Sequence, residues 1–325
     1  MAPLRAIAQI RRFYRASLTA QRRLNAICAS RELTREVWTE LEPRLRYVLS
    51  DCDGVLWNSA VEIPGASDTF RRLRERGLRV GFVTNNSTKT KAELLEKFGA
   101  MGFDVQPEEI FCVNELTAKY LSAKDITGSV YMIGTTSLQK ELEAAGLRCN
   151  PAGPEPCDGH HNSWLSMKMD PDVEAVVIGF DYHFSMAKIC RAITYLQKPG
   201  CQFVATESDA RVANVERTGI VLPSTGALLA SVEASAGRRA VIIGKPSITM
   251  AEVIRRQLPD LRADNTLFIG DYLDSDIRFG SNNGFTTLLV ETGMHSRQDL
   301  VKGDDTLPKP TFYTKCVADI LAFME

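Results

Sequence analysis

The feature that most constrains the fold is a set of five short apolar runs, each followed by a polar or glycine-containing turn. They span residues 47–50, 79–83, 240–243, 266–269 and 286–290. These runs are rich in β-branched and aromatic residues, as buried strands are. Amphipathic segments with helical spacing lie between them at 66–76, 89–101, 247–258 and 277–282. The alternation predicts an α/β protein with a doubly wound, parallel, Rossmann-like sheet.

The second and third runs are separated by about a hundred and fifty residues, far more than a crossover helix needs. Further strands are expected there at 130–133, 175–179 and 202–205, with helices at 137–145 and 185–196. We therefore predict an α/β cap domain, residues 125–238, inserted into a catalytic core formed by 31–124 and 239–325. Residues 1–30 form a separate basic extension.

Charge and composition exclude some partners. The 325 residues carry a formal net charge of −1, so the basic surface that nucleic-acid binding requires is not expected. No apolar run is long enough to cross a bilayer, and 44 % hydrophobic residues is ordinary for a soluble protein. We expect no nucleic acid and no membrane as partners, which leaves small molecules.

Two features of the chain bear on its compartment. Eight cysteines occur without a CxxC pair, which suits reduced thiols and predicts a cytoplasmic protein. The first thirty residues contain six arginines, and no acidic residue occurs before Glu32; such an Arg-rich, acid-poor start is typical of a mitochondrial transit peptide. A basic surface helix or a disordered arm explains the same residues, so both readings stay open.

Polar residues cluster where the predicted strands end. Asp51 and Asp53 follow the first run, Thr84 to Ser87 the second, Lys245 the third and Asp271 the fourth. The carboxyl ends of parallel strands line one crevice of an open α/β sheet, and ligands bind there. We therefore expect these four segments to converge on one site.

Asp51 and Asp53 form the central pair of acids. Two residues apart in an extended chain, they point roughly the same way and raise each other's pKa unless a cation neutralises them. Mg²⁺, which prefers oxygen ligands, fits this position. Asp51 is then a candidate nucleophile, and Asp53 a candidate acid and base. A solvated acidic turn is the alternative for an isolated pair of this kind.

Thr84, Asn85 and Asn86 precede a predicted helix, whose N-terminus favours phosphoryl oxygens. Ser87 or Thr88 could instead serve only as the N-cap of that helix. Lys245 is placed to neutralise a phosphate as a point charge, although a lysine at a strand end is more often simply solvated.

In chain order, the segments DCDGVLW, TNNST, GKP and GDYLDSD resemble the four motifs of the haloacid dehalogenase superfamily. The fit is best to the eukaryotic phosphoglycolate and pyridoxal phosphate phosphatases, also called 4-nitrophenylphosphatases, and extends from about residue 31 to the C-terminus. This resemblance implies a Mg²⁺-dependent phosphatase that forms a phosphoaspartyl intermediate on Asp51.

The same resemblance implies roles for the other residues. Asp53 is the acid and base, Thr84, Asn85, Asn86 and Lys245 bind the phosphate, and Mg²⁺ is held by Asp51, Asp271 and the backbone carbonyl of Asp53. Asp276 would hold a metal-bound water or orient Lys245, and the role of Asp274 stays open. In the cap, His183 is a candidate substrate-binding residue, although a lone histidine more often caps a helix or satisfies a turn.

The substrate is expected to be a small phosphorylated metabolite. The segment 183–201 resembles phosphoglycolate phosphatases, which favours 2-phosphoglycolate or glycerol phosphate. Against this, Thr206–Asp209 departs from the family's usual Thr-Asn-x-Asp, and Pro223–Gly226 from its usual small-residue turn. The alternatives are a pyridoxal phosphate phosphatase, a protein phosphatase, or a non-catalytic binding protein on the same fold. The resembling enzymes often pair through their caps, so a homodimer of this kind is expected as well.

Overall fold

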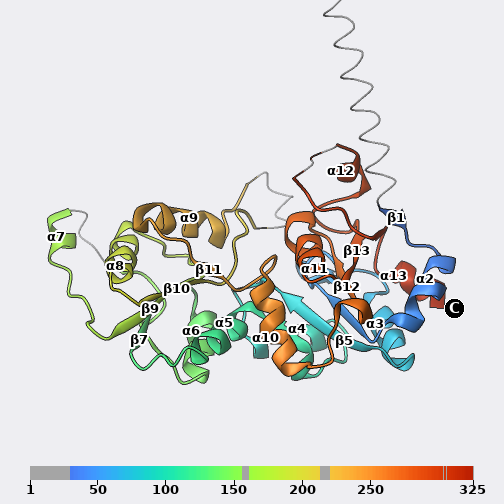
Figure 1. Ribbon diagram of the computed structural model, residues 1–325, viewed down its shortest axis with the longest axis horizontal. Coiled ribbons are helices and arrows are strands. Elements are labelled where there is room, and N and C mark those ends of the chain that lie inside the picture. Colours follow the sequence, from blue (N-terminus) through green and yellow to red (C-terminus); the bar gives the residue numbers. More distant parts are fainter. Residues whose placement is uncertain (1–29, 156–160, 213–219, 303, 305, 325) are drawn as a thin grey trace, which may run out of the picture.

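Two parallel sheets lie side by side along the length of the molecule in the computed structural model (Figure 1). The structure describes residues 30–155, 161–212, 220–302, 304 and 306–324. The predicted basic extension thus lies outside the described residues, apart from Ser30. The predicted fold class, a parallel α/β core with a second α/β unit, is confirmed.

The larger sheet has seven strands in the order β1-β14-β13-β12-β2-β5-β6, and all of its pairings are parallel. The strands are β1 (Arg31–Glu32), β2 (Tyr47–Ser50), β5 (Arg79–Thr84), β6 (Ile110–Cys112), β12 (Thr266–Gly270), β13 (Thr286–Val290) and β14 (Phe312–Thr314). A short antiparallel hairpin, β3 (Trp57–Asn58) with β4 (Val61–Glu62), follows β2. The centre of the sheet is therefore formed by β12, β2 and β5, whose carboxyl ends carry three of the predicted polar segments.

The second sheet has five parallel strands in the order β11-β10-β9-β7-β8. They are β7 (Ser129–Ile133), β8 (Arg148–Cys149), β9 (Val173–Ile178), β10 (Gln202–Ala205) and β11 (Val241–Ile242). The unit that carries this sheet is called the cap.

One strand prediction is wrong. The run 240–243 was expected in the core sheet, but β11 pairs with Val204 and Ala205 of β10 at the edge of the cap sheet. A run of four apolar residues indicates that a strand is present, but it does not indicate which sheet the strand joins. The segment that directly precedes Lys245 therefore belongs to the cap sheet and not to the core sheet. The predicted residue limits of the two domains stay a prediction.

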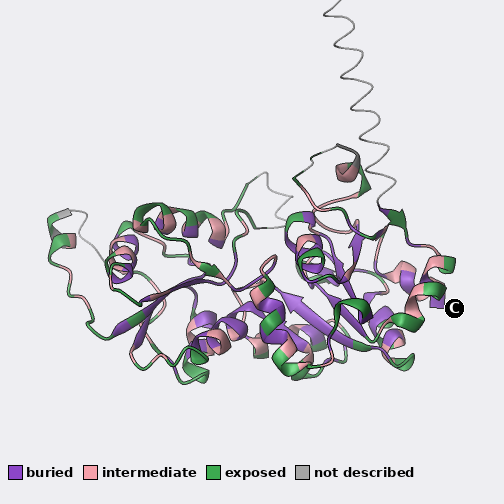
Figure 2. Ribbon diagram, viewed as in Figure 1, coloured by how far each residue is buried: buried purple, intermediate pink, exposed green. Residues whose placement is uncertain are grey.

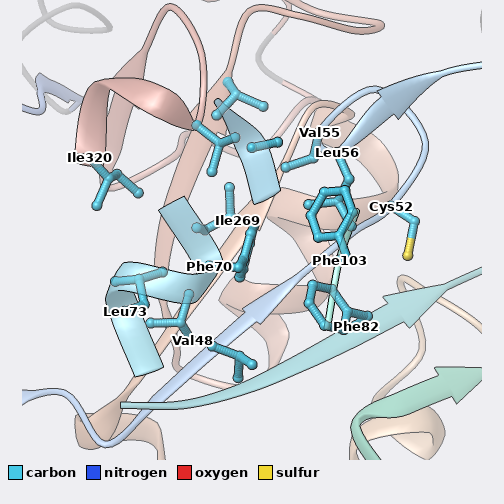
Figure 3. Close-up of a cluster of buried hydrophobic side chains, with 14 of the residues drawn as sticks. Val48, Cys52, Val55, Leu56, Phe70, Leu73, Phe82, Phe103, Ile269 and Ile320 are labelled. Atoms are coloured by element: carbon cyan, nitrogen blue, oxygen red, sulfur yellow. The ribbon is translucent and has the colours of Figure 1, made fainter. Parts of the chain in front are cut away.

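Helices cover both faces of the larger sheet, as a doubly wound fold requires. On one face, Val48 of β2, Phe82 of β5 and Ile269 of β12 pack against Phe70 of a covering helix (Figure 3). Figure 2 shows that the buried residues follow the strands of both sheets, while the exposed residues lie on the outer sides of the helices. The helices on this face are α2 (Arg35–Leu41), α3 (Ala66–Glu75), α4 (Lys91–Ala100) and α13 (Ala318–Met324).

The opposite face joins the core to the cap. One cluster of buried side chains includes Leu49 of β2 together with Val130 of β7 and Val177 of β9. Helices α5 (Val113–Ser122) and α6 (Thr136–Ala144) pack against each other between the two sheets. Because this contact is apolar and buried, it fixes the cap over the carboxyl ends of the core strands.

The remaining helices are α7 (His161–Leu165), α8 (Met186–Leu196), α9 (Thr225–Ala236), α10 (Ile248–Gln257), α11 (Arg278–Asn282) and α12 (Arg297–Lys302). The predicted helices at 66–76, 89–101, 137–145, 185–196, 247–258 and 277–282 are present as α3, α4, α6, α8, α10 and α11, with ends that differ by two residues or fewer. Within the described residues, no helix is long and apolar enough to cross a membrane.

Candidate active site

The predicted polar segments meet at one cavity of about 490 Å³ between the core and the cap. Seven of the eight predicted site residues line it: Asp51, Asp53, Thr84, Asn85, Asn86, Lys245 and Asp271. Asp51 and Asp271 directly follow strands that pair with each other, β2 and β12. Parallel strand order thus brings together side chains that are far apart in the sequence.

Lys245 is the centre of a buried ion-pair network. Its Nζ lies 2.6 Å from Oδ1 of Asp51 and 2.7 Å from Oδ1 of Asp276, and its side chain is 2 % exposed. Burial lowers the pKa of Lys245, but the carboxylates of Asp276 and Asp51 outweigh it and raise the pKa above its ordinary value. Lys245 is therefore a fixed positive charge beside Asp51.

Asp276 also fixes the turn after β12. Its Oδ2 accepts hydrogen bonds from the backbone N–H groups of Asp271 and Tyr272, both at 3.1 Å. Asp274 takes no part in this network, because it is exposed and pairs with Arg278 at 2.7 Å. The structure thus separates two acids whose roles the sequence left open.

Asp51, Asp271 and Asp276 bring carboxylate oxygens within 4.8 Å of one another. Burial raises the pKa of Asp51 to about 7, although the charge of Lys245 opposes this effect. Burial, together with the charges of Asp276 and Asp51, raises the pKa of Asp271 well above its ordinary value. A divalent cation beside these carboxylates would offset both effects, so the donor set is chemically suited to a metal with oxygen ligands.

Two glycines leave the space that the carboxylate of Asp271 occupies. A Cβ atom on Gly293 would stand 1.8 Å from Oδ2 of Asp271, and one on Gly54 would stand 2.3 Å from the same atom. Gly54 also has a φ of +87°, which glycine adopts more readily than other residues. The N–H of Met294 donates to this oxygen at 2.7 Å. The position of the Asp271 carboxylate is therefore fixed closely by the surrounding backbone.

Asp53 is held at the cavity by a tryptophan and a lysine. Nε1 of Trp57 donates to its Oδ1 at 2.8 Å, and Nζ of Lys97 lies 3.5 Å from the same oxygen. Lys97 also lies over the Trp57 ring, 4.2 Å from the centroid. The side chain of Asp53 is 38 % exposed, so it is oriented without being enclosed.

The three predicted residues at the end of β5 and in the turn after it, Thr84, Asn85 and Asn86, have different hydrogen-bond partners. The Oγ1 of Thr84 accepts from the N–H of Asn86 at 3.1 Å, and Nδ2 of Asn86 lies 3.5 Å from Oδ2 of Asp53. The side chain of Asn85 accepts from the N–H of Lys245 at 2.8 Å and donates to its carbonyl at 2.9 Å. Asn85 therefore fixes the backbone of Lys245, whereas Thr84 and Asn86 lie beside Asp53.

The expected position of this turn at a helix N-terminus is wrong. Helix α4 begins at Lys91, and its N-cap is Thr90, whose Oγ1 accepts from the N–H of Glu93 at 3.1 Å. The alternative role of Ser87 or Thr88 as that N-cap is wrong for the same reason. A Thr90–Glu93 capping box identifies the helix start in the sequence.

Cap residues that follow β9 form the opposite wall of the cavity. The rings of Phe180 and Tyr182 line it and meet edge to face, 4.9 Å between centroids. His183 is exposed and is not among the described residues that line the cavity; its N–H donates to Oδ1 of Asp181 at 2.8 Å. The structure does not bring His183 together with the other predicted residues, and its role stays a prediction.

Two acids of the cap were not predicted as site residues. Glu207 is 2 % exposed, and its Oε1 accepts from Oγ of Ser224 at 3.0 Å and from the N–H of Thr225 at 3.2 Å. Burial, with the nearby charge of Asp209, raises the pKa of Glu207 to about 7. Oδ2 of Asp209 accepts from Nδ2 of Asn85 at 3.1 Å and so links cap to core. A signal for Glu207 was present in the sequence, because it stands where the family's Thr-Asn-x-Asp pattern has an asparagine.

Comparison with known proteins gives the family. A model described as haloacid dehalogenase-like hydrolase matches residues 48–148, and a HAD-hydrolase-like model matches residues 242–320. Human glycerol-3-phosphate phosphatase is 38 % identical over 294 residues, which cover 86 % of this chain and 90 % of that protein. The chain belongs to the haloacid dehalogenase-like hydrolases. The predicted family is confirmed.

Other members of the family agree with this assignment. Bovine chronophin is 36 % identical over 87 % of this chain and 94 % of its own length. The p-nitrophenyl phosphatase from Archaeoglobus fulgidus superposes with a TM-score of 0.73 at 25 % identity, over 86 % of this chain and all of that chain. Glycerol phosphate phosphatase from Mycobacterium tuberculosis, solved in complex with magnesium, superposes with a TM-score of 0.68 at 25 % identity, over 86 % and 77 % of the two chains. The protein is a phosphatase of small phosphomonoesters, as the sequence predicts.

Proposed function

We propose that this phosphatase transfers the phosphoryl group of 2-phosphoglycolate or glycerol phosphate first to Asp51 and then to water. The observation that carries the proposal is the 2.6 Å contact between Nζ of Lys245 and Oδ1 of Asp51. A buried carboxylate loses its charge unless a cation stabilises it, and only the charged form is a good nucleophile. The fixed charge of Lys245 therefore favours the charged, reactive form of Asp51 and attracts the incoming phosphate.

Asp53 acts as the acid and then as the base. It protonates the oxygen that leaves with the alcohol, and it then takes a proton from the water that attacks the phosphoaspartate. The hydrogen bond from Trp57 at 2.8 Å supports this role, since it fixes one carboxylate oxygen and thereby orients the other.

The phosphate is bound by Lys245, Thr84 and Asn86, which line the cavity near Asp51 and Asp53. Asn85 acts through Lys245, because both ends of its amide are bonded to the Lys245 backbone. Of the four residues predicted to bind phosphate, Asn85 is therefore a positioning residue, and the other three contact the phosphate. Phosphoryl transfer depends mainly on such positioning and on charge stabilisation.

Mg²⁺ is the proposed cofactor, held by Asp51, Asp271 and the backbone carbonyl of Asp53. The raised pKa values of Asp51 and Asp271, and the space that Gly293 leaves, are consistent with a cation at this position. When bound, Mg²⁺ supplies positive charge to the oxygens of the transferring group. Relatives include a glycerol phosphate phosphatase solved with magnesium.

The Gly293→Ala substitution should weaken Mg²⁺ binding about tenfold or more, because the new Cβ would displace Oδ2 of Asp271. Isothermal titration calorimetry of the protein with MgCl₂ measures this directly. Gly99→Ala is the matched control, since a Cβ there meets nothing within 4 Å. Wild-type affinity in Gly293→Ala would rule out Asp271 as a ligand.

The cavity supports a small substrate over a protein substrate. Its volume of about 490 Å³ suits a metabolite, and the rings of Phe180 and Tyr182 narrow it from the cap side. Pyridoxal phosphate is the alternative small substrate. Pairing of two chains through their caps and a cytoplasmic or mitochondrial location stay predictions.

A panel of phosphorylated metabolites tests the proposal. With Mg²⁺, kcat/KM should be highest for 2-phosphoglycolate or glycerol 3-phosphate, and chelation with EDTA should abolish turnover of every ester in the panel. A preference for pyridoxal phosphate or a phosphopeptide would refute the substrate proposal. Turnover that survives EDTA would refute the proposed cofactor.

A further inference from the structure

We propose that Arg211 binds a second anionic group of the substrate, so that the preferred phosphomonoesters carry a carboxylate at the end away from the phosphate. The inference rests on the proposed phosphatase site and narrows its substrates to one class. It distinguishes 2-phosphoglycolate, which has such a carboxylate, from glycerol phosphate, which does not.

The charges around the cavity give the first argument. Six acids line it: Asp51, Asp53, Glu207, Asp209, Asp271 and Asp276. Two cationic residues line it as well, Lys245 and Arg211. The Nζ of Lys245 is already within 2.7 Å of two carboxylates. Over the described part of the chain, Arg211 has no carboxylate within 4.0 Å of its guanidinium. A second negative charge in the substrate would be repelled by the acids unless Arg211 met it.

The position of Arg211 gives the second argument. Asp209, two residues earlier, accepts from Nδ2 of Asn85, which in turn bonds the backbone of Lys245. Only Ala210 lies between Asp209 and Arg211 in the chain, so their Cα atoms are no more than about 7 Å apart. The guanidinium of Arg211 can thus approach a ligand whose phosphate lies at Lys245, and both arginine and lysine line the same cavity.

The backbone that carries Arg211 is fixed. Arg211 forms an antiparallel bridge with Pro223, and the N–H of Val212 donates to the carbonyl of Leu222 at 3.0 Å. At the base of this ladder, Glu207 accepts from Ser224 and Thr225. A cation on a fixed backbone loses less freedom when it binds a ligand, which favours specific recognition over a transient contact.

The chemistry of the side chain gives the class of ligand. The fork of an arginine matches a carboxylate with two parallel hydrogen bonds. The neighbouring cap residues that line the cavity, Phe180, Tyr182, Val212 and Leu222, present rings and aliphatic groups. These surfaces suit a short carbon chain and cannot neutralise an anion.

The test compares two substrates that differ in one group. 2-Phosphoglycolate carries a carboxylate where 2-hydroxyethyl phosphate carries a neutral CH₂OH. In the Arg211→Gln holoenzyme, kcat/KM for 2-phosphoglycolate should fall about 10- to 100-fold, mainly through KM, while that for 2-hydroxyethyl phosphate stays within about twofold. Arg211→Lys should restore part of the preference, because it keeps the charge and loses the fork.

Arg239→Gln is the matched control, since this arginine is 89 % exposed and pairs with Glu233. It should leave both substrates unaffected. Equal losses for both substrates in Arg211→Gln, or no loss for either, would overturn the role of Arg211 while the proposed phosphatase site stands. If the wild-type enzyme hydrolyses neither ester, the proposed substrates themselves are wrong, and so is a carboxylate-binding role for Arg211.

Discussion

The Asp51→Asn variant should lose kcat by about 10⁴-fold or more, which at 1.36 kcal/mol per factor of ten raises the barrier by about 5.4 kcal/mol. An amide has the shape of the carboxylate but cannot attack phosphorus as an anion. Steady-state hydrolysis of 4-nitrophenyl phosphate in saturating Mg²⁺ measures the loss. The effect should be this large because the other groups of the cavity stabilise charge and none replaces the nucleophile.

The fold of Asp51→Asn should survive, since the two side chains are nearly isosteric and Lys245 keeps its contact with Asp276 at 2.7 Å. Its thermal melting curve and circular dichroism spectrum serve as the control. Residual activity within about tenfold of the wild type would show that water attacks the substrate directly.

The Lys245→Met variant should lose both activity and stability. Removing a donor that stabilises the transferring group costs about 10²- to 10³-fold in kcat. The free energy of unfolding should fall by about 3–5 kcal/mol, because Asp51 and Asp276 are left buried without their common counter-charge. Urea denaturation and kinetics at a temperature where the variant is folded measure the two effects separately.

Lys188→Met separates catalysis from stability. Lys188 pairs with Asp181 at 2.5 Å in the cap, and the two side chains are 3 % and 1 % exposed. The Lys188→Met substitution should lower the free energy of unfolding by about as much as Lys245→Met does. It should leave kcat within a few-fold of the wild type. A folded Lys245→Met protein with a similar, small change in kcat would show that Lys245 is only structural.

Much of the site could be predicted from the sequence because it depends on where strands end. Asp51 and Asp271 directly follow strands, and Thr84 is the last residue of one; these strands have four to six residues and a clear apolar pattern. In a parallel sheet the carboxyl ends of such strands meet, so sequence order alone placed these side chains together. Lys245 was also placed correctly at the cavity, although its strand belongs to the other sheet.

The parts that were missed depend on contacts between distant segments. Strands β6 and β14 have three residues each, too few for a pattern to be recognised. Glu207 and Asp209 lie between strand and loop, and their partners Ser224 and Asn85 are 17 and 124 residues away. Sequence periodicity does not predict such pairings. Only the departures from the family pattern at Glu207 and at Pro223–Gly226 indicated an unusual environment in the cap.

The central claim is that Asp51 carries the phosphoryl group, and trapping that intermediate tests it most directly. The Asp53→Asn variant should accumulate it from 4-nitrophenyl phosphate, because 4-nitrophenolate leaves without a proton donor, whereas the attack of water needs a base. Acid quenching after mixing with the ³²P-labelled substrate should reveal a burst of nitrophenolate equal to the enzyme and a hydroxylamine-sensitive label on the peptide that contains Asp51. The absence of both burst and label, or a label on any other peptide, would contradict the account.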